Sequence, residues 1–289
     1  MPKMIYNLSF SFFGFSLIHG EKMSKNYFAG IDVGTSYIKT VIIDGKNKIV
    51  GSFTERSSSD LRNSIDIAFE GALAEANIQK DAIKHITATG FGRENVSFAD
   101  SVKTEISAHA KGAYHFFPKK INILDIGGQD TKIIKTDAKG KTLSFKMNRK
   151  CAAGTGSFLE EIAYKLCIPL DEMSSFAAKS NKDTALGSFC TVFASSEILT
   201  RIKEGEEIEN MVKSAFESVV RRVIEMDTFE GTIVITGGVV AYNEIILKIL
   251  AKYVENELLT PPEPQLTGAF GAALFAKEAK DLNHTFFLN

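Results

Sequence analysis

Runs of apolar and β-branched residues, interrupted by short glycine-containing turns, recur along most of the chain. The segment YFAGIDVGTSYIKTVIID at residues 27–44 predicts a buried strand, a turn and a second strand. The segment INILDIGGQDTKIIKTD at residues 121–137 has the same form. A third segment, GTIVITGGVVAYNEIILKIL at residues 231–250, predicts a buried strand, a Gly-Gly turn and an amphipathic helix. Strands that alternate with helices in this way indicate an α/β fold.

The first two of these segments align with each other at an offset of 93 positions. The aligned pairs are Asp32 with Asp125, Gly34 with Gly127, and Lys39 with Lys132. A repeat of this length that keeps an aspartate and a glycine in the turn indicates two similar lobes.

Each of the two hairpins carries the residue types of a phosphate site. Glycine lets the backbone approach a phosphate closely, N–H groups of the turn bind its oxygens, and an aspartate at the strand end can hold hydrated Mg²⁺. We therefore assign Asp32 and Asp125 to Mg²⁺. The expected phosphate-site residues are Gly34, Thr35, Ser36, Lys39, Gly127 and Gly128. For either hairpin alone the alternative is an ordinary turn, and Lys39 is equally well explained as an exposed lysine.

Gly237 and Gly238 follow the third buried strand. Their turn leaves space for a flat ring or a ribose, so after two phosphate hairpins it is a candidate adenosine site. Taken alone, it is an ordinary connection between a strand and a helix. The chain contains no P-loop motif, and its hairpin turns lead to strands rather than to helices, unlike the Rossmann fingerprint.

The composition is that of a globular protein, with 44% apolar residues, 24% charged residues and a formal net charge of −1. No basic run stands out, so we expect neither nucleic acid nor a membrane as a partner. Three cysteines, an odd and small number, indicate a reducing cytosol rather than a disulfide framework. The Phe-rich stretch at residues 8–18 is too short to span a bilayer. We expect residues 1–22 to be a non-native or disordered extension ahead of a natural start at Met23.

Two of the cysteines adjoin predicted helix starts. Cys151 precedes the glycine-rich turn of NRKCAAGTGSFLEEIA at residues 148–163, and Cys190 lies in GSFCTVFASSEI at residues 187–198. Helix N-termini stabilise thiolates. Two thiolates are too few for a tetrahedral zinc or iron–sulfur site, but a two-fold dimer supplies four. The alternative is that both are buried small hydrophobes, which is the role we assign to Cys167.

The order of phosphate hairpin, connecting helix, second phosphate hairpin and Gly-Gly turn resembles the superfamily of actin, Hsp70-type chaperones, hexokinase and acetate kinase. The resemblance implies an actin-like α/β fold with two ribonuclease-H-like lobes and ATP·Mg²⁺ in the cleft. Residues 100–116 fit the helix that links the lobes, and residues 267–280 fit a closing helix. The expected domains are a first lobe at residues 23–118, a second lobe with the cysteines at 119–266, and a closing helix and tail at 267–289.

Combined with GIDVGTSYIKTV, ILDIGGQDTKII and VITGGVVAYN, the cysteine motifs resemble the activator components of 2-hydroxyacyl-CoA dehydratases. These belong to the BadF/BadG/BcrA/BcrD ATPase family, which also supplies benzoyl-CoA reductase subunits. The likeness, from about residue 27 to residue 279, implies a cytoplasmic, oxygen-sensitive homodimer with one [4Fe–4S] cluster held by Cys151 and Cys190 of each chain. It further implies that a ferredoxin or flavodoxin reduces the cluster. ATP hydrolysis then changes the angle between the helices that end on the cluster, which drives one electron to a dehydratase or reductase partner carrying its own iron–sulfur cluster.

The catalytic assignment leaves two candidates, Asp125 and Gln129, for positioning the attacking water. Glu105 and His109, four residues apart, share one face of the linking helix. Two ligands are too few for a metal, so we expect a solvated or cleft-facing pair. The TGFGREN turn at residues 89–95 is either a contact with a partner or the other lobe, or only a tight connection.

Two positions depart from the pattern expected of the family. Ala108 stands where relatives often have cysteine, and Ser195 stands where they often have glutamate. These departures leave the subfamily, and therefore the partner, open. The alternative functions are a small-molecule kinase of the same superfamily without a cluster, and a nucleotide-switched binding module without redox chemistry.

Overall fold

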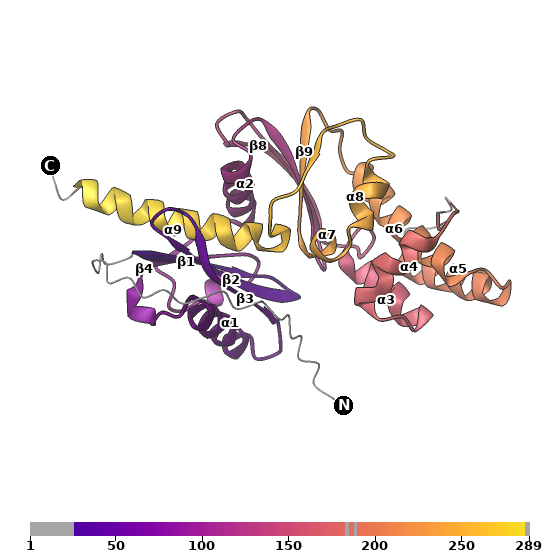
Figure 1. The fold of residues 1–289 in the computed structure, drawn as a ribbon, viewed down its shortest axis with the longest axis horizontal. Coiled ribbons are helices and arrows are strands. Elements are labelled where there is room, and N and C mark those ends of the chain that lie inside the picture. The colour runs from indigo at the N-terminus through magenta and orange to yellow at the C-terminus, as the bar shows by residue number, and fades with distance from the viewer. Residues whose placement is uncertain (1–25, 183–184, 188–189, 287–289) are drawn as a thin grey trace, which may run out of the picture.

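The computed structural model describes residues 26–182, 185–187 and 190–286. The predicted N-terminal extension at residues 1–22 lies outside the described residues. Two twisted sheets with helices packed on them form the body of the molecule, and the long C-terminal helix projects from one end (Figure 1). No helix in the described part of the chain is long and apolar enough to cross a bilayer.

The first sheet has the strand order β3-β2-β1-β4-β5. Its strands are β1 (Tyr27–Val33), β2 (Tyr37–Asp44), β3 (Ile49–Arg56), β4 (Ile83–Thr89) and β5 (Ser101–Val102). The first three strands are antiparallel neighbours, and β4 runs parallel to β1. Strand β1 is buried along almost its whole length, as its apolar run predicts.

The second sheet repeats this arrangement in the order β8-β7-β6-β9-β10. Its strands are β6 (Ile121–Ile126), β7 (Thr131–Thr136), β8 (Thr142–Asn148), β9 (Thr232–Thr236) and β10 (Leu258–Leu259). Again three antiparallel strands are followed by a parallel one. Even the register is repeated, since Asp32 lies opposite Lys39 in one sheet and Asp125 opposite Lys132 in the other. The predicted two ribonuclease-H-like lobes are confirmed, and the offset of 93 is a structural repeat.

The helices divide between the two sheets. They are α1 (Leu61–Ala76), α2 (Glu105–Phe116), α3 (Gly156–Leu166), α4 (Met173–Lys179), α5 (Thr191–Lys203), α6 (Ile208–Ile224), α7 (Gly238–Tyr242), α8 (Ile245–Leu250) and α9 (Thr267–Phe286). Short 3₁₀ turns are η1 (Lys80–Ala82), η2 (Arg93–Asn95), η3 (Leu170–Glu172) and η4 (Pro264–Leu266). Helix α1 packs on β2 and β3, whereas α3 to α6 gather at the far end of the second sheet (Figure 1).

The predicted linking and closing helices, α2 and α9, pack closely against each other. The linking helix is shorter than the predicted segment, because Ser101–Val102 pairs with β4 as a strand and Thr104 caps the helix. Where α2 and α9 cross, glycine permits close approach of the backbones. A methyl group on Gly271 would overlap the carbonyl oxygen of Ala108. The buried Ala108, one of the two departures from the family pattern, therefore lies in this crossing.

We expect Gly271→Ala to lower the free energy of unfolding by about 2–3 kcal/mol, because the added methyl group forces the two helices apart. Chemical denaturation of the purified protein measures the change. Gly45→Ala is the matched control, since no atom lies within 4 Å of the position that its methyl group would occupy. Equal stability of the two variants would contradict this account of the crossing.

Candidate functional site

The turns of the two hairpins face each other between the lobes. The first is closed by a hydrogen bond from Gly34 N–H to Tyr37 O at 3.1 Å, and the second by one from Gly127 N–H to Asp130 O at 2.9 Å. They approach so closely that a methyl group on Gly128 would lie 2.8 Å from Ser36 Oγ. Equivalent turns from two lobes thus meet at one place, as a polyphosphate clasp requires.

Asp125, at the end of β6, is buried, and each of its carboxylate oxygens has a hydrogen-bonding neighbour. Its Oδ1 accepts a hydrogen bond from Thr236 Oγ1 at 2.8 Å, and its Oδ2 lies 3.3 Å from Lys132 Nζ. Burial alone would raise the pKa of Asp125, but His109, Lys132 and the Thr236 hydroxyl outweigh it and hold the pKa well below its usual range. Asp125 is therefore a carboxylate at every physiological pH.

Asp32, at the equivalent position of β1, is also buried, but its Oδ1 finds no hydrogen-bond partner among the described residues. Thr89 Oγ1 and His109 Nδ1 are likewise buried without a hydrogen-bond partner within the described part of the chain. Thr89 lies opposite Asp32 in the sheet, and Asp32 and His109 both lie beside Gly268. A buried carboxylate oxygen without a partner is costly unless a cation or water satisfies it. The residues therefore fit the Mg²⁺ site predicted from the sequence.

Lys132 is the centre of an ion cluster that the sequence analysis did not identify. Its side chain is 2% exposed, and Nζ lies 2.6 Å from Asp130, 2.8 Å from Glu105 and 3.3 Å from Asp125. Burial alone would lower the pKa of Lys132, but the three carboxylates raise it above its ordinary value. The repeat offered a signal, because Lys132 aligns with Lys39, which is half-buried and close enough to lower the pKa of Asp125.

Glu105 and His109 are the cleft-facing pair that their spacing allowed. Glu105 reaches from α2 to Lys132 on the second sheet, and His109 Nδ1 lies 3.5 Å from Asp125 Oδ1. Burial raises the pKa of Glu105, and Lys132 opposes this. The linking helix thus supplies one neighbour of Asp125, His109, and one partner of Lys132, Glu105.

We expect Lys132→Met to lower the free energy of unfolding at pH 7 by about 3–5 kcal/mol, because it leaves buried carboxylates without their cation. The depressed pKa of Asp125 stabilises the fold above the ordinary carboxyl pKa, and this contribution is lost as pH falls through the folded-state pKa. The difference in the free energy of unfolding between the variant and the parent protein should therefore become smaller at acidic pH. Urea unfolding across a pH series measures it.

Lys135→Met on the same strand is the matched control. Lys135 is 27% exposed and pairs with Asp227 at the surface. Removing a surface pair of this kind changes stability by about 1 kcal/mol or less. Equal losses in the two variants would show that the buried cluster is not special.

The Gly-Gly turn also has the expected form. Gly237, at φ 101°, donates its N–H to Pro264 O at 3.0 Å, and no atom lies within 4 Å of the position that a methyl group on Gly238 would occupy. Open space beside the backbone fits a ring or ribose. The single helix predicted after the turn is wrong, because Asn243 ends α7, and α8 follows as a separate helix.

Three further predicted site residues stand at the hairpin turns. Thr35 and Gln129 are exposed, whereas Ser36 is half-buried. Gln129 is thus accessible to a bound ligand, while Asp125 is already engaged by its neighbours. The assignment of Asp125 or Gln129 as the residue that orients the attacking water remains a prediction.

The TGFGREN turn is a tight connection held against the strand that carries Asp32. Gly92 N–H donates to Val33 O at 2.9 Å, and Arg93 Nη1 donates to Gly90 O at 3.1 Å. Phe91 at its tip is 73% exposed. A contact between this turn and a partner remains a prediction.

All three cysteines are exposed thiols. Cys151 precedes the turn that opens α3, and Cys190 caps the start of α5, as predicted. The alternative that these two are buried hydrophobes is therefore wrong. It is also wrong for Cys167, which is exposed and ends α3 in the left-handed conformation at φ 55°.

Helices α3 and α5, which follow Cys151 and Cys190, pack against each other. Ser195 on α5, the second departure from the family pattern, donates to Glu161 on α3 at 3.4 Å. Two hydrophobic side chains next to Cys190 are exposed, Val192 at 71% and Phe193 at 66%. No group of three or more potential metal ligands occurs among the described residues of one chain. Exposed cysteine sulfurs at two helix starts have the donor chemistry that an iron–sulfur cluster requires.

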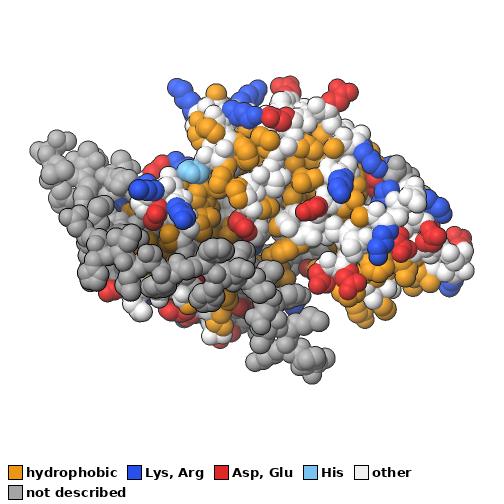
Figure 2. Space-filling model, in the orientation of Figure 1, with side chains coloured by type: hydrophobic (Ala, Val, Ile, Leu, Met, Phe, Trp, Pro, Cys, Tyr) orange, Lys and Arg blue, Asp and Glu red, His pale blue; other side chains and the backbone are white. Residues whose placement is uncertain are grey.

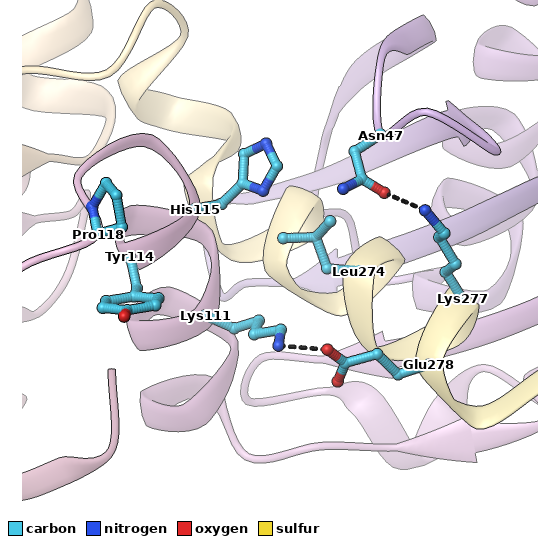
Figure 3. A pocket seen from close by; sticks show the side chains of 8 residues that line it. All are labelled: Asn47, Lys111, Tyr114, His115, Pro118, Leu274, Lys277 and Glu278. Carbon is cyan, nitrogen blue, oxygen red and sulfur yellow. Dashed lines mark hydrogen bonds and ion pairs between the residues drawn. The ribbon is translucent and has the colours of Figure 1, made fainter. Parts of the chain in front are cut away.

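A cavity of about 430 Å³ lies elsewhere, between α2, α9 and the β2–β3 turn (Figure 3). Its lysines already have partners, since Lys111 pairs with Glu278 and Lys277 donates to Asn47 Oδ1 at 2.7 Å. On the face shown in Figure 2, acidic and basic side chains are interspersed rather than gathered into a patch of one sign. Neither feature competes with the hairpins as a site for a nucleotide.

Comparison with known proteins agrees with this geometry. The chain is 40% identical to the activator of lactoyl-CoA dehydratase from Anaerotignum propionicum over 259 residues, covering 88% of this chain and 98% of the relative. The activator of the 2-hydroxyisocaproyl-CoA dehydratase from Clostridium difficile, solved with bound ADPNP, superposes with a TM-score of 0.85 at 36% identity, covering 90% and 97% of the two chains. Component A of the (R)-2-hydroxyglutaryl-CoA dehydratase from Acidaminococcus fermentans gives a TM-score of 0.84 at 34% identity, covering 88% and 99%. The model of the BadF/BadG/BcrA/BcrD ATPase family matches residues 29–276. The chain therefore belongs to the BadF/BadG/BcrA/BcrD ATPase family.

Proposed function

We propose that this ATPase is the activator of a 2-hydroxyacyl-CoA dehydratase or a related reductase. It would transfer one electron at a time through a [4Fe–4S] cluster that bridges two copies of the chain. The observation that carries the proposal is that the segment following Cys151 is hydrogen-bonded to the second phosphate hairpin, through Gly156 N–H to Gly127 O, so that a thiol loop and a predicted nucleotide site are in direct contact. A kinase needs no such thiol.

The residues have the following proposed roles. The two hairpin turns and the turn after β9 bind ATP, and Asp32 and Asp125 hold Mg²⁺, which neutralises phosphate charge when it is bound. Cys151 and Cys190 of each chain supply the four thiolates of the cluster. A ferredoxin or flavodoxin supplies the electron, and the dehydratase or reductase component with its own iron–sulfur cluster receives it.

Proximity alone gives the coupling a physical basis. A change of charge at the hairpins on ATP hydrolysis acts on peptide groups whose carbonyls accept hydrogen bonds from Gly156 and Ser157, at the start of the helix that follows the cysteine loop. Exposed hydrophobic side chains beside Cys190 offer a surface for a second copy and for the acceptor protein. Hydrolysis at the hairpins is then mechanically coupled to electron transfer at the cysteines.

The test is visible spectroscopy of protein purified without oxygen, reduced with dithionite, freed of it and mixed with a one-electron acceptor dye. We expect a brown protein whose oxidation by the dye is faster with ATP than with ADP. A colourless protein that phosphorylates an added sugar or carboxylate would instead establish the kinase alternative. A colourless protein with no such transfer would leave only a nucleotide-switched binding module.

A further inference from the structure

The first turn of α3 is built directly on the second phosphate hairpin. Gly156 N–H donates to Gly127 O at 2.9 Å, and Ser157 N–H donates to Gly128 O at 2.7 Å. The Ser157 hydroxyl donates to the same Gly128 oxygen at 2.8 Å. The carbonyl groups of the hairpin, which face away from a bound phosphate when its N–H groups face toward it, therefore hold the start of the helix.

The contact between α3 and the second hairpin is closely packed. A methyl group on Gly156 would lie 3.1 Å from Gly128 Cα and 3.2 Å from a methyl group of Val239. On its other side, Gly128 approaches Ser36 of the first lobe. Gly128 thus lies between the first hairpin and α3, and a displacement of its peptide must displace the helix start, because close-packed contacts transmit movement.

The cysteine loop, residues 149–155, is also held by side chains of the same sheet. The Thr131 hydroxyl, fully buried at the start of β7, donates to Gly154 O at 2.5 Å. Asn148 Nδ2, on β8, donates to Cys151 O at 3.1 Å and to Ala153 O at 2.8 Å. The loop is consequently bonded to Thr131, which follows the phosphate hairpin, and it leads into α3, whose first turn is bonded to the same hairpin.

We propose that Ser157 and Thr131 are positioning residues that transmit the phosphate state of the hairpin to Cys151. The inference rests on the proposed function for its biological meaning, but the mechanical claim concerns this chain alone. When the γ-phosphate is present, the peptides of Gly127 and Gly128 turn toward it. The Ser157 and Thr131 hydroxyls carry that rotation into the loop, which changes the exposure of the Cys151 thiol.

The test uses a chain with one thiol, in which Cys167→Ser and Cys190→Ser leave Cys151 as the only cysteine. The rate of maleimide labelling of Cys151 is measured with no nucleotide, with ADP and with a non-hydrolysable ATP analogue. We expect the ADP and analogue rates to differ by about threefold or more, the size expected when one hydrogen bond is remade. Ser157→Ala and Thr131→Val should each reduce this ratio toward one while the nucleotide dissociation constant changes by about twofold or less.

Ser175→Ala is the matched control, because the Ser175 hydroxyl also donates to a carbonyl near a helix start, that of Glu172, but on α4. It should leave the labelling ratio unchanged. The proposal is overturned if Ser157→Ala and Thr131→Val both keep the parent ratio. It is also overturned if either variant loses nucleotide binding, because that hydroxyl then belongs to the nucleotide site itself.

This outcome is separate from that of the proposed function. The single-cysteine chain lacks Cys190 and is labelled without a cluster, so a nucleotide-dependent ratio that Ser157→Ala abolishes would stand even if the native protein contained no iron. Conversely, the native protein could contain iron while the labelling rate of Cys151 in the single-cysteine chain is the same with every nucleotide. That result would refute the proposed roles of Ser157 and Thr131 and leave the redox function intact.

Discussion

Asp125→Asn should lower the rate of ATP hydrolysis by about 10³-fold while the protein stays brown. Asparagine keeps the shape of the side chain and can still accept the hydrogen bond from Thr236, but it removes the charge that we assign to Mg²⁺. Lys132 keeps Glu105 and Asp130 as partners, so the fold should survive. Phosphate release measures hydrolysis, and the visible spectrum reports the cluster independently.

Asp130→Asn is the matched control for this prediction. Asp130 also pairs with Lys132 but stands at the more exposed side of the cluster, with its side chain 27% exposed. Its loss should reduce hydrolysis by less than about tenfold, in the range of one surface ion pair. Equal losses in the two variants would assign the effect to Lys132 rather than to the carboxylate at the end of β6.

Cys151→Ser and Cys190→Ser should each remove the iron completely, because a serine hydroxyl does not replace a thiolate ligand. Nucleotide binding should persist, since the hairpin turns are unchanged. Iron analysis after anaerobic purification and the affinity for a fluorescent ATP analogue measure the two effects.

Cys167→Ser provides the comparison, because Cys167 is also exposed but stands at the opposite end of α3. This variant should keep the full iron content. If Cys167→Ser lost its iron and Cys151→Ser kept it, the ligand assignment would be wrong.

The hairpins were predictable because their signals are local. A β-branched run, a turn with aspartate and glycine and a second run define each hairpin within 18 residues or fewer, and the shared register of Asp32 with Lys39 and Asp125 with Lys132 follows. The two similar lobes then followed from the repeat. Turn chemistry of this kind survives folding because it depends on neighbours in the chain.

The ion cluster around Lys132 could not be predicted in the same way. Glu105 stands on α2, and it reaches Lys132 only because α2 lies against the second sheet. The residue pattern of α2 or of β7 alone does not predict this contact. The partnerless oxygen of Asp32 is equally a product of tertiary packing.

Cys167 shows how a local signal was misread. Its apolar surroundings, IAYKLCIPL, suggested a buried position inside a helix. The helix ends at Leu166 instead, and Cys167 takes the left-handed cap conformation two residues before Pro169, a common place for proline after a helix. The proline was the available signal, and it outweighs the hydrophobicity of the flanking residues.

The most direct measurement of the central claim is iron and acid-labile sulfide analysis of the anaerobically purified protein, combined with its mass by light scattering. We predict a dimer with about four irons and about four sulfides per two chains. A dimer or monomer that hydrolyses ATP at full rate but contains no iron after anaerobic reconstitution would contradict it.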